Sequence, residues 1–272
     1  MPDQTTSDRA DGPPRTRPTA LVTGGSAGIG LAFARHLAAD GYDLVLVARD
    51  RARLADAAAR LRADHGVDVQ VLSADLSDRD QLQQVADRVA DPDRPVDLLV
   101  NNAGFAVHQG FVRSDVREQE RLLDVHCRAV LVLTHAAGRA MAQRRSGAVI
   151  NVSSVAAYTA GGTYAAAKAW TTAFSEAMAI ELGRHGVTVT ALLPGYVRTD
   201  LVGDRLAARL PDWAFVDVDR LVRTALADSR RGRILSVPTK RYRVAATVLR
   251  VAPRSLVRLA SSGRSLRRRT LR

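Results

Sequence analysis

Short apolar runs rich in β-branched residues alternate with longer segments along this chain from Thr19 onward. The longer segments carry Ala, Leu, Arg and Glu at the spacing of three and four residues that is typical of an amphipathic helix. Such alternation indicates βαβ units around a parallel sheet. The expected strands are Ala20 to Val22, Asp43 to Ala48, Asp68 to Ser73, Asp97 to Asn101, Ala148 to Val152, Thr188 to Leu193 and Ile234 to Val237. The pattern predicts an α/β fold, with a doubly wound parallel sheet of seven strands and helices on both faces.

The chain divides into three parts. Residues 1–18 hold three Asp and four Pro with few apolar side chains, a composition that predicts a disordered leader. Residues 19–238 are expected to form the α/β domain. Residues 239–272 are expected to form a basic amphipathic helix and tail, with a helix over 242–259 that is interrupted near Pro253.

The net charge of +12 is concentrated at the C-terminal end. Residues 239–272 hold eleven basic and no acidic residues, which leaves 12 − 11 = +1 for the remainder. This end either makes a peripheral contact with an anionic membrane through residues 240–272 or is a solvated tail. Nucleic-acid binding is not expected, because the only aromatic residue among these charges is Tyr242.

No apolar run is long enough to span a membrane, and the N-terminus has no apolar core typical of a secretory signal. We therefore expect a cytoplasmic protein, with a peripheral position at a membrane as the alternative. Cys127 is the single cysteine, which excludes an internal disulfide and a thiolate metal cluster. No metal site is predicted.

A glycine-rich turn follows the first expected strand and leads into a helix expected over Leu31 to Ala39. Its sequence is Thr23-Gly24-Gly25-Ser26-Ala27-Gly28-Ile29-Gly30. Glycines let a backbone approach a pyrophosphate closely, and a helix start offers free N–H groups and the positive end of its dipole. The turn predicts a dinucleotide site in which Gly24, Ser26, Gly28, Ile29 and Gly30 contact the cofactor.

The end of the second strand favours NADP over NAD. Ala48 occupies the position where an acidic residue usually accepts hydrogen bonds from the adenosine ribose. Arg49 beside it presents a planar fork of donors that fits a 2′-phosphate. The alternatives are that Arg49 is simply solvated and that Asp50 binds the ribose of NAD.

Tyr164 and Lys168 are spaced so that a helix places both on one face, a turn apart. An ammonium there is expected to lower the phenol pKa, which makes Tyr164 a usable acid. Ser154, upstream, has a hydroxyl that can hydrogen-bond a substrate oxygen as charge develops on it.

In this order, the segments Gly24-x-x-x-Gly28-x-Gly30, Asn101-Asn102-Ala103-Gly104, Ser153-Ser154, Tyr164-x-x-x-Lys168 and Pro194-Gly195-Tyr196-Val197-Arg198-Thr199 resemble the short-chain dehydrogenase/reductase family over residues 19 to about 238. The resemblance implies a Rossmann-type fold and reversible hydride transfer between NADP(H) and a carbonyl or secondary alcohol. It also implies that Lys168 and Tyr164 contact the cofactor. Further cofactor contacts implied by the resemblance are Asp75, Leu76, Asn102, Ala103, Gly104, Pro194, Gly195, Val197 and Thr199.

The resemblance further implies a homodimer or homotetramer assembled through residues 116–143 and 163–185. The segment 200–217 is expected to be an apolar lid, which favours an apolar ketone or alcohol as substrate. Its apolar residues are Leu201, Val202, Leu206, Leu210, Trp213 and Phe215. The alternative function is a non-catalytic dinucleotide-binding sensor or scaffold, associated with a membrane through the basic C-terminus.

Two positions depart from the family pattern. His126 stands where the family usually has an Asn that holds a water in a proton relay behind the lysine, so His126 is either a relay residue or a hydrogen-bonded core histidine. A relay role predicts activity that falls below about pH 6.5. The loop between Ser154 and Tyr164 is short, which leaves Ser153 as an alternative to Ser154.

Overall fold

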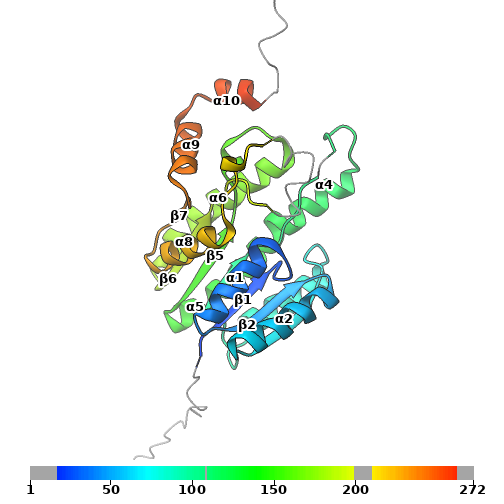
Figure 1. Cartoon of the computed structure of the whole chain (residues 1–272), viewed down its shortest axis with the longest axis vertical. Coiled ribbons are helices and arrows are strands. Elements are labelled where there is room, and N and C mark those ends of the chain that lie inside the picture. Colours follow the sequence, from blue (N-terminus) through cyan, green and yellow to red (C-terminus); the bar gives the residue numbers. More distant parts are fainter. Residues whose placement is uncertain (1–16, 108, 199–209, 262–272) are drawn as a thin grey trace, which may run out of the picture.

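The computed structural model describes residues 17–107, 109–198 and 210–261. Nearly all of the expected leader, Thr199 and the lid residues Leu201, Val202 and Leu206 lie outside the described residues. The strands form one parallel sheet of seven in the order β3-β2-β1-β4-β5-β6-β7 (Figure 1). They are β1 Thr19–Thr23, β2 Asp43–Ala48, β3 Val69–Ser73, β4 Leu98–Asn101, β5 Gly147–Val152, β6 Val187–Leu192 and β7 Leu235–Ser236. The predicted fold class is confirmed.

Helices connect the strands and cover both faces of the sheet. The α-helices are α1 Gly28–Ala39, α2 Arg51–His65, α3 Arg79–Ala90, α4 Val116–Leu123, α5 Ala129–Arg144, α6 Gly162–Gly183, α8 Val218–Arg230, α9 Lys240–Val251 and α10 Arg254–Ser261. Shorter elements are the π-helical turn η1 Asp124–Arg128 and the 3-10 turns η2 Val155–Tyr158 and η3 Asp212–Ala214. Helices α1, α2 and α8 lie on one face, and α3, α5 and α6 lie on the other.

Alternating side chains of each strand supply the two cores. In β1, Ala20 and Val22 join the core beneath α1, α2 and α8, whereas Leu21 points into the opposite core. In β2, Leu44 and Val45 are divided between the two cores in the same way. Because both faces are covered, these strands are apolar almost throughout, as expected for a parallel sheet.

Aspartate side chains cap four of the nine described α-helices. Asp50, Asp78, Asp115 and Asp217 accept hydrogen bonds from backbone N–H groups in the first turns of α2, α3, α4 and α8. Helix α1 differs, because Ala27 at its N-cap makes no side-chain hydrogen bond. The first N–H groups of α1 therefore have no side-chain cap and face the region where β1 ends.

Helix α1 starts three residues earlier than the sequence predicts, so Gly28 and Gly30 belong to its first turn. A Cβ atom on Gly30 would lie 2.1 Å from the carbonyl oxygen of Gly24. Gly24 itself has a φ of 67°, in the left-handed region. Close packing of the helix start against the turn thus requires both glycines.

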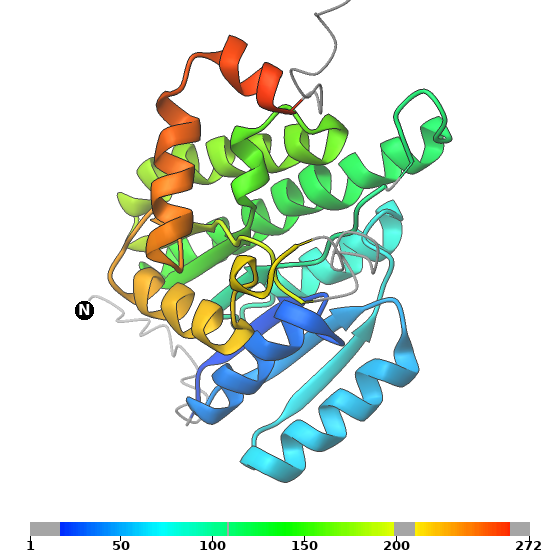
Figure 2. The same ribbon diagram turned by 45° about the horizontal axis from the view of Figure 1, so that its top comes forward.

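The C-terminal segment forms α9 and α10, with Ala252 and Pro253 between them. Figure 2 shows both helices on the outside of the molecule, beside η2 and the start of α6. Among the described residues, no helix is long and apolar enough to cross a membrane.

Candidate active site

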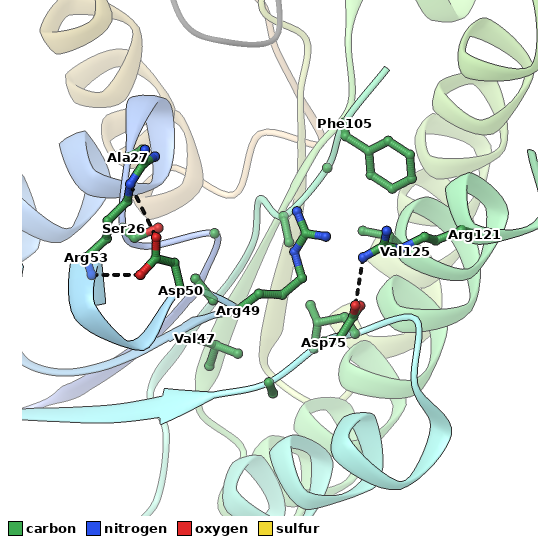
Figure 3. Close-up of a pocket in the computed structure, with 16 residues that line it drawn as sticks. Ser26, Ala27, Val47, Arg49, Asp50, Arg53, Asp75, Phe105, Arg121 and Val125 are labelled. Carbon is green, nitrogen blue, oxygen red and sulfur yellow. Dashed lines mark hydrogen bonds and ion pairs between the residues drawn. The ribbon is translucent and has the colours of Figure 1, made fainter. Parts of the chain in front are cut away.

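A cavity of about 670 Å³ lies where β1, β2, β3 and β4 end (Figure 3). Most of the lining comes from residues at or just after the ends of these strands, which the parallel order of the sheet brings together, and Arg121 and Val125 are added from α4 and η1. This is the edge at which parallel sheets bind ligands, where the strand order reverses between β1 and β4. The lining includes Gly24, Ser26, Val47, Arg49, Asp50, Asp75, Leu76, Ala103, Gly104, Phe105 and Arg121.

Asn102 fixes the glycine turn in this cavity. Its side-chain amide donates to the carbonyl oxygen of Thr23 at 2.9 Å, and its backbone N–H donates to the Thr23 hydroxyl at 2.9 Å. The turn after β4 is thereby tied to the turn after β1. Asn102 also lines the neighbouring cavity, as does Ile29.

The two carboxylates of the larger cavity already have partners. Asp50 accepts from the Arg53 backbone at 3.0 Å and pairs with the Arg53 guanidinium at 3.4 Å. Asp75 accepts from Arg121 at 2.7 Å and from the Ser77 hydroxyl at 2.6 Å. Burial would raise the pKa of Asp75, but the hydrogen bonds from Ser77 and the Arg121 charge outweigh it and hold the pKa below its usual value.

Arg49 is exposed on the cavity wall and extends between these two carboxylates (Figure 3). Among the described residues, its guanidinium makes no hydrogen bond or ion pair with a side chain. Because Arg53 and Arg121 pair with Asp50 and Asp75, Arg49 carries the one unpaired charge among these described side chains, and it is positive. The arrangement suits a phosphate better than a neutral hydroxyl pair.

A second cavity, of about 360 Å³, continues from the first and shares Gly24, Ala27, Ala103 and Gly104 with it. It reaches the ends of β5 and β6 and is lined by three of the four residues expected to carry the chemistry, His126, Tyr164 and Lys168, whereas Ser154 is not part of its lining. The residues that line it include Gly28, Ile29, Asn102, His126, Ser153, Tyr164, Lys168, Pro194 and Arg198.

Lys168 is buried at the floor of this second cavity. Its ammonium donates to the carbonyl oxygen of Val152 at 2.5 Å and lies 5.8 Å from the centre of the Tyr164 ring. Burial lowers the pKa of Lys168 to about 7, although the negative charge of an ionised Cys127 would act in the opposite direction. Lys168 thus carries a proton that it can exchange near neutral pH.

The expected lowering of the Tyr164 pKa is wrong for this structure. Burial raises the pKa of Tyr164 to about 12, although a hydrogen bond with Ser154 acts in the opposite direction. The reason is that Lys168 is bonded to the Val152 carbonyl and is itself easily deprotonated, so it does not offset the burial of the phenol. Tyr164 is therefore a phenol that holds its proton at neutral pH.

The structure distinguishes the two serines. The Ser153 hydroxyl is buried and bonds to the Lys168 carbonyl oxygen at 2.8 Å and to the Thr172 hydroxyl at 2.7 Å. The Ser154 hydroxyl, at the N-cap of η2, accepts from the Ala156 N–H at 3.1 Å and interacts with Tyr164. Ser154 is thus the serine beside the phenol, whereas Ser153 anchors α6 to β5.

His126 lies in the π-helical turn η1 and is almost completely buried. Its Nε2 is 2.8 Å from the Phe105 carbonyl oxygen and 3.1 Å from the Phe105 backbone nitrogen. Its ring meets that of Tyr164 edge to face, with 5.5 Å between centroids. Burial and the Lys168 charge lower the pKa of His126 to about 3, so the expected loss of activity below pH 6.5 cannot come from this imidazole.

The residues after β6 divide between the cavity and the core. Pro194 lines the second cavity, whereas Val197 is buried in the core with α1 and α8. Gly195 packs against the Tyr242 ring from α9, to which an added Cβ would come within 2.1 Å. Gly195 and Val197 therefore shape this loop from behind and do not line the cavity.

Two arginines were missed as site residues by the sequence analysis. Arg121 joins Asp75 across 46 residues of sequence, and its guanidinium lies 5.8 Å from the Phe105 ring centre. Arg198 lines the second cavity, pairs with Asp212 and lies 4.1 Å from the Phe215 ring centre. The residues near Arg121 in the sequence do not indicate a site role, because its partner Asp75 follows the distant strand β3. Arg198 lies within the segment 194–199, whose order along the chain was the available signal.

The joined cavities fit a nicotinamide dinucleotide. The uncapped start of α1 supplies N–H donors at the glycine turn, and Arg49 in the larger cavity can donate hydrogen bonds to a phosphate. The buried phenol and amine stand at the other end, beside the loop after β6. Among the described residues, no group of His, Cys, Asp and Glu is arranged to hold a metal ion.

Residues 18–209 match the short chain dehydrogenase family. The chain is 38% identical over 242 residues to the short-chain reductase protein NovJ of Streptomyces niveus, covering 86% of each chain. It superposes on a short-chain dehydrogenase from Sphingobium yanoikuyae in complex with NADPH, with a TM-score of 0.79, 36% identity and coverage of 88% of this chain and 94% of that one. The bulky-bulky ketone specific alcohol dehydrogenase from Comamonas testosteroni gives a TM-score of 0.75 at 32% identity, covering 86% and 92%.

The chain belongs to the short-chain dehydrogenase/reductase family. It is an oxidoreductase that acts on a carbonyl or alcohol group with a nicotinamide cofactor.

Proposed function

We propose that this protein is an NADP-dependent reductase of apolar ketones that also oxidises the corresponding secondary alcohols. The observation that carries the proposal is the meeting of Ser154, Tyr164 and Lys168 at one end of a groove whose other end is lined by Arg49. The NADPH complex of the similar Sphingobium yanoikuyae dehydrogenase supports the choice of cofactor.

The cofactor, when bound, supplies or takes up the hydride. In the reduction, Tyr164 donates its phenolic proton to the carbonyl oxygen, and the Ser154 hydroxyl donates a hydrogen bond to the same oxygen. Lys168 replaces the proton that Tyr164 gives up, because its pKa of about 7 lets it exchange protons near neutral pH. Lys168 and the residues after β4 and β6 hold the nicotinamide end of the cofactor.

The proposed preference for NADP rests on which charged side chains of the larger cavity are already paired. Asp50 and Asp75 are paired with Arg53 and Arg121, so a ribose would have to share each carboxylate with an arginine. Arg49 is exposed beside them and fits a 2′-phosphate. Thr199, outside the described residues, is proposed as a further cofactor contact.

An apolar substrate is supported by the described part of the lid. Trp213 on η3 is 69% exposed, and Phe215 packs against Arg198 of the catalytic cavity. The similar Comamonas testosteroni enzyme is specific for bulky-bulky ketones. We therefore propose a ketone with apolar groups on both sides of the carbonyl.

The cofactor proposal is tested by titrating the protein with NADPH and NADH and following cofactor fluorescence. Arg49→Ala is expected to weaken NADPH binding about tenfold, as for loss of a charge-assisted hydrogen bond, and to leave NADH binding unchanged. The matched control is Arg51→Ala, an exposed arginine that does not line the cavity. Equal loss in both variants, or tighter binding of NADH by the wild type, would contradict the NADP assignment.

The catalytic proposal is tested with a panel of apolar ketones. Tyr164→Phe is expected to lower kcat at least about a hundredfold while NADPH still binds. Tyr158→Phe, a half-buried tyrosine on η2, is the control and keeps its activity. A wild type that binds NADPH and reduces none of the ketones would instead favour the sensor or scaffold function.

A further inference from the structure

Helix α9 presents an apolar stripe to solvent. Val244, Val248 and Val251 recur at the spacing of four and three residues that aligns them on one face of a helix, and they are 64%, 56% and 75% exposed. Tyr242 and Ala246 are on the opposite face and pack inward. Leu256 on α10 is also more than half exposed. A helix face of this kind is unusual on a protein surface unless something covers it.

Basic side chains accompany this stripe, and no acidic residue occurs anywhere in residues 239–272. Lys240, Arg241 and Arg243 lie on α9, and Arg254 and Arg258 on α10. By sequence, five more arginines follow between residues 262 and 272. The remainder of the chain carries a net charge of only 12 − 11 = +1, so the positive charge is concentrated in the part of the sequence that also carries the apolar stripe.

The charge identifies what covers this face. A second copy of the chain docked through the same face would bring the basic side chains of α9 and α10 against their own copies, and neither helix carries an acidic residue to pair with them. A nucleic acid would satisfy the charge but would leave the valines in water. An anionic lipid surface satisfies both features, because its headgroups attract the basic side chains and its interface buries the apolar ones.

We propose that α9 and α10 dock this protein on anionic membranes, with Val244, Val248, Val251 and Leu256 facing the lipid. The docking face is joined to the segment that carries the catalytic serine. Arg254 donates to the Tyr158 carbonyl oxygen at 3.3 Å, and the Ser261 hydroxyl accepts from the Ala160 N–H at 3.1 Å. These two bonds tie α10 to the loop between Ser154 and Tyr164.

The test is co-sedimentation of the full chain with vesicles of phosphatidylcholine alone and of equal parts phosphatidylcholine and phosphatidylglycerol. The wild type is expected to sediment with the anionic vesicles only, and less so as salt is raised. The triple variant Val244→Ser, Val248→Ser, Val251→Ser is expected to bind at least about tenfold more weakly, because three apolar side chains no longer contribute burial. A charge variant, Lys240→Gln, Arg243→Gln, Arg258→Gln, is expected to lose binding as well.

The matched control replaces three exposed β-branched residues elsewhere, Val112→Ser, Val116→Ser and Ile234→Ser, and is expected to bind as the wild type does. Oxidoreductase activity and the unfolding midpoint of each variant show that the fold is intact. Binding to neither vesicle overturns the proposal. Undiminished binding of the valine variant also overturns it, since charge alone then accounts for the contact, and a change in its oligomeric state would show that the stripe is an interface between copies.

Discussion

Burial sets the proton chemistry of the site one residue at a time. Tyr164 keeps its proton up to about pH 12, so the phenol is the form present at neutral pH. Donation to a carbonyl oxygen needs the phenol, whereas removal of a proton from an alcohol needs the phenolate. The protonation state of Tyr164 therefore favours ketone reduction over alcohol oxidation at neutral pH.

The two directions are expected to differ in their dependence on pH. Ketone reduction should fall above about pH 7, where Lys168 loses the proton that it passes to Tyr164, while alcohol oxidation should rise up to about tenfold per pH unit as the phenolate fraction grows. The measurement is kcat in both directions between about pH 6 and 8 with saturating cofactor. An oxidation rate that levels off below about pH 8 would show that the phenol pKa is much lower than burial makes it.

His126 is expected to affect stability toward acid more than catalysis. The unfolded imidazole takes up a proton near pH 6.5, but the folded one resists it down to about pH 3 because it is buried beside Lys168. Between these values the unfolded state binds more protons, so stability falls as pH falls, by at most about 1.4 kcal/mol per pH unit. This loss of stability begins near pH 6.5 and is complete near pH 3.

Urea unfolding at several pH values measures this effect. In His126→Asn the part of the acid dependence due to His126 should disappear, while His135→Asn, an exposed histidine on α5, should behave as the wild type does. The same acid slope in both variants would refute the assignment. The pH profile of activity should be the same in His126→Asn and wild type between about pH 5.5 and 7.5.

Helix α9 holds the loop after β6 in place. The Tyr242 hydroxyl donates to the Ala214 carbonyl oxygen at 2.6 Å and accepts from the Tyr196 N–H at 3.2 Å. Its ring fills the space in front of Gly195. One side chain thus ties α9 to the loop after β6 and to η3.

Gly195→Ala is expected to destabilise the protein by about 1–3 kcal/mol, because the added methyl group overlaps the Tyr242 ring. In the Tyr242→Ala background the same change should cost much less, since the overlap is gone. A double-mutant cycle by urea unfolding measures this coupling. Equal costs in both backgrounds would show that the ring does not restrict Gly195.

The elements differ in how far the sequence predicts them. The strands and the glycine turn were predicted because β-branched runs and Gly24, Gly28 and Gly30 act locally. The π-helical turn η1 was not, because nothing in residues 124–128 distinguishes it from the adjoining α-helix. The pKa of Tyr164 was predicted in the wrong direction, since burial and the Val152 carbonyl that holds Lys168 depend on how β5 and α6 pack.

At the scale of the whole molecule, the sheet order joins these parts. The reversal between β1 and β4 opens the cofactor groove, and β5 and β6 extend it to the catalytic cavity. Helices α9 and α10 lie beside the segment η2. Helices α3 and α5 instead cover one face of the sheet, where Ala129 and Leu133 of α5 pack into the core. The basic C-terminal face and the surface of α5 and α6 are thus available for different contacts.

We expect the protein to assemble as a homodimer or homotetramer through α5 and α6. Leu131 on α5 and Ile180 on α6 are 45% and 62% exposed, and the two helices together offer both signs of charge, with Arg139 and Arg144 on α5 and Glu176 and Glu181 on α6. Leu131→Glu with Ile180→Glu should shift the protein toward the monomer in sedimentation analysis, because burying two unpaired carboxylates in an interface is costly. Ile234→Glu, an exposed position just before β7, should leave the assembly unchanged. A wild type that is monomeric at micromolar concentration, or a double variant that stays assembled, would move the contact away from α5 and α6.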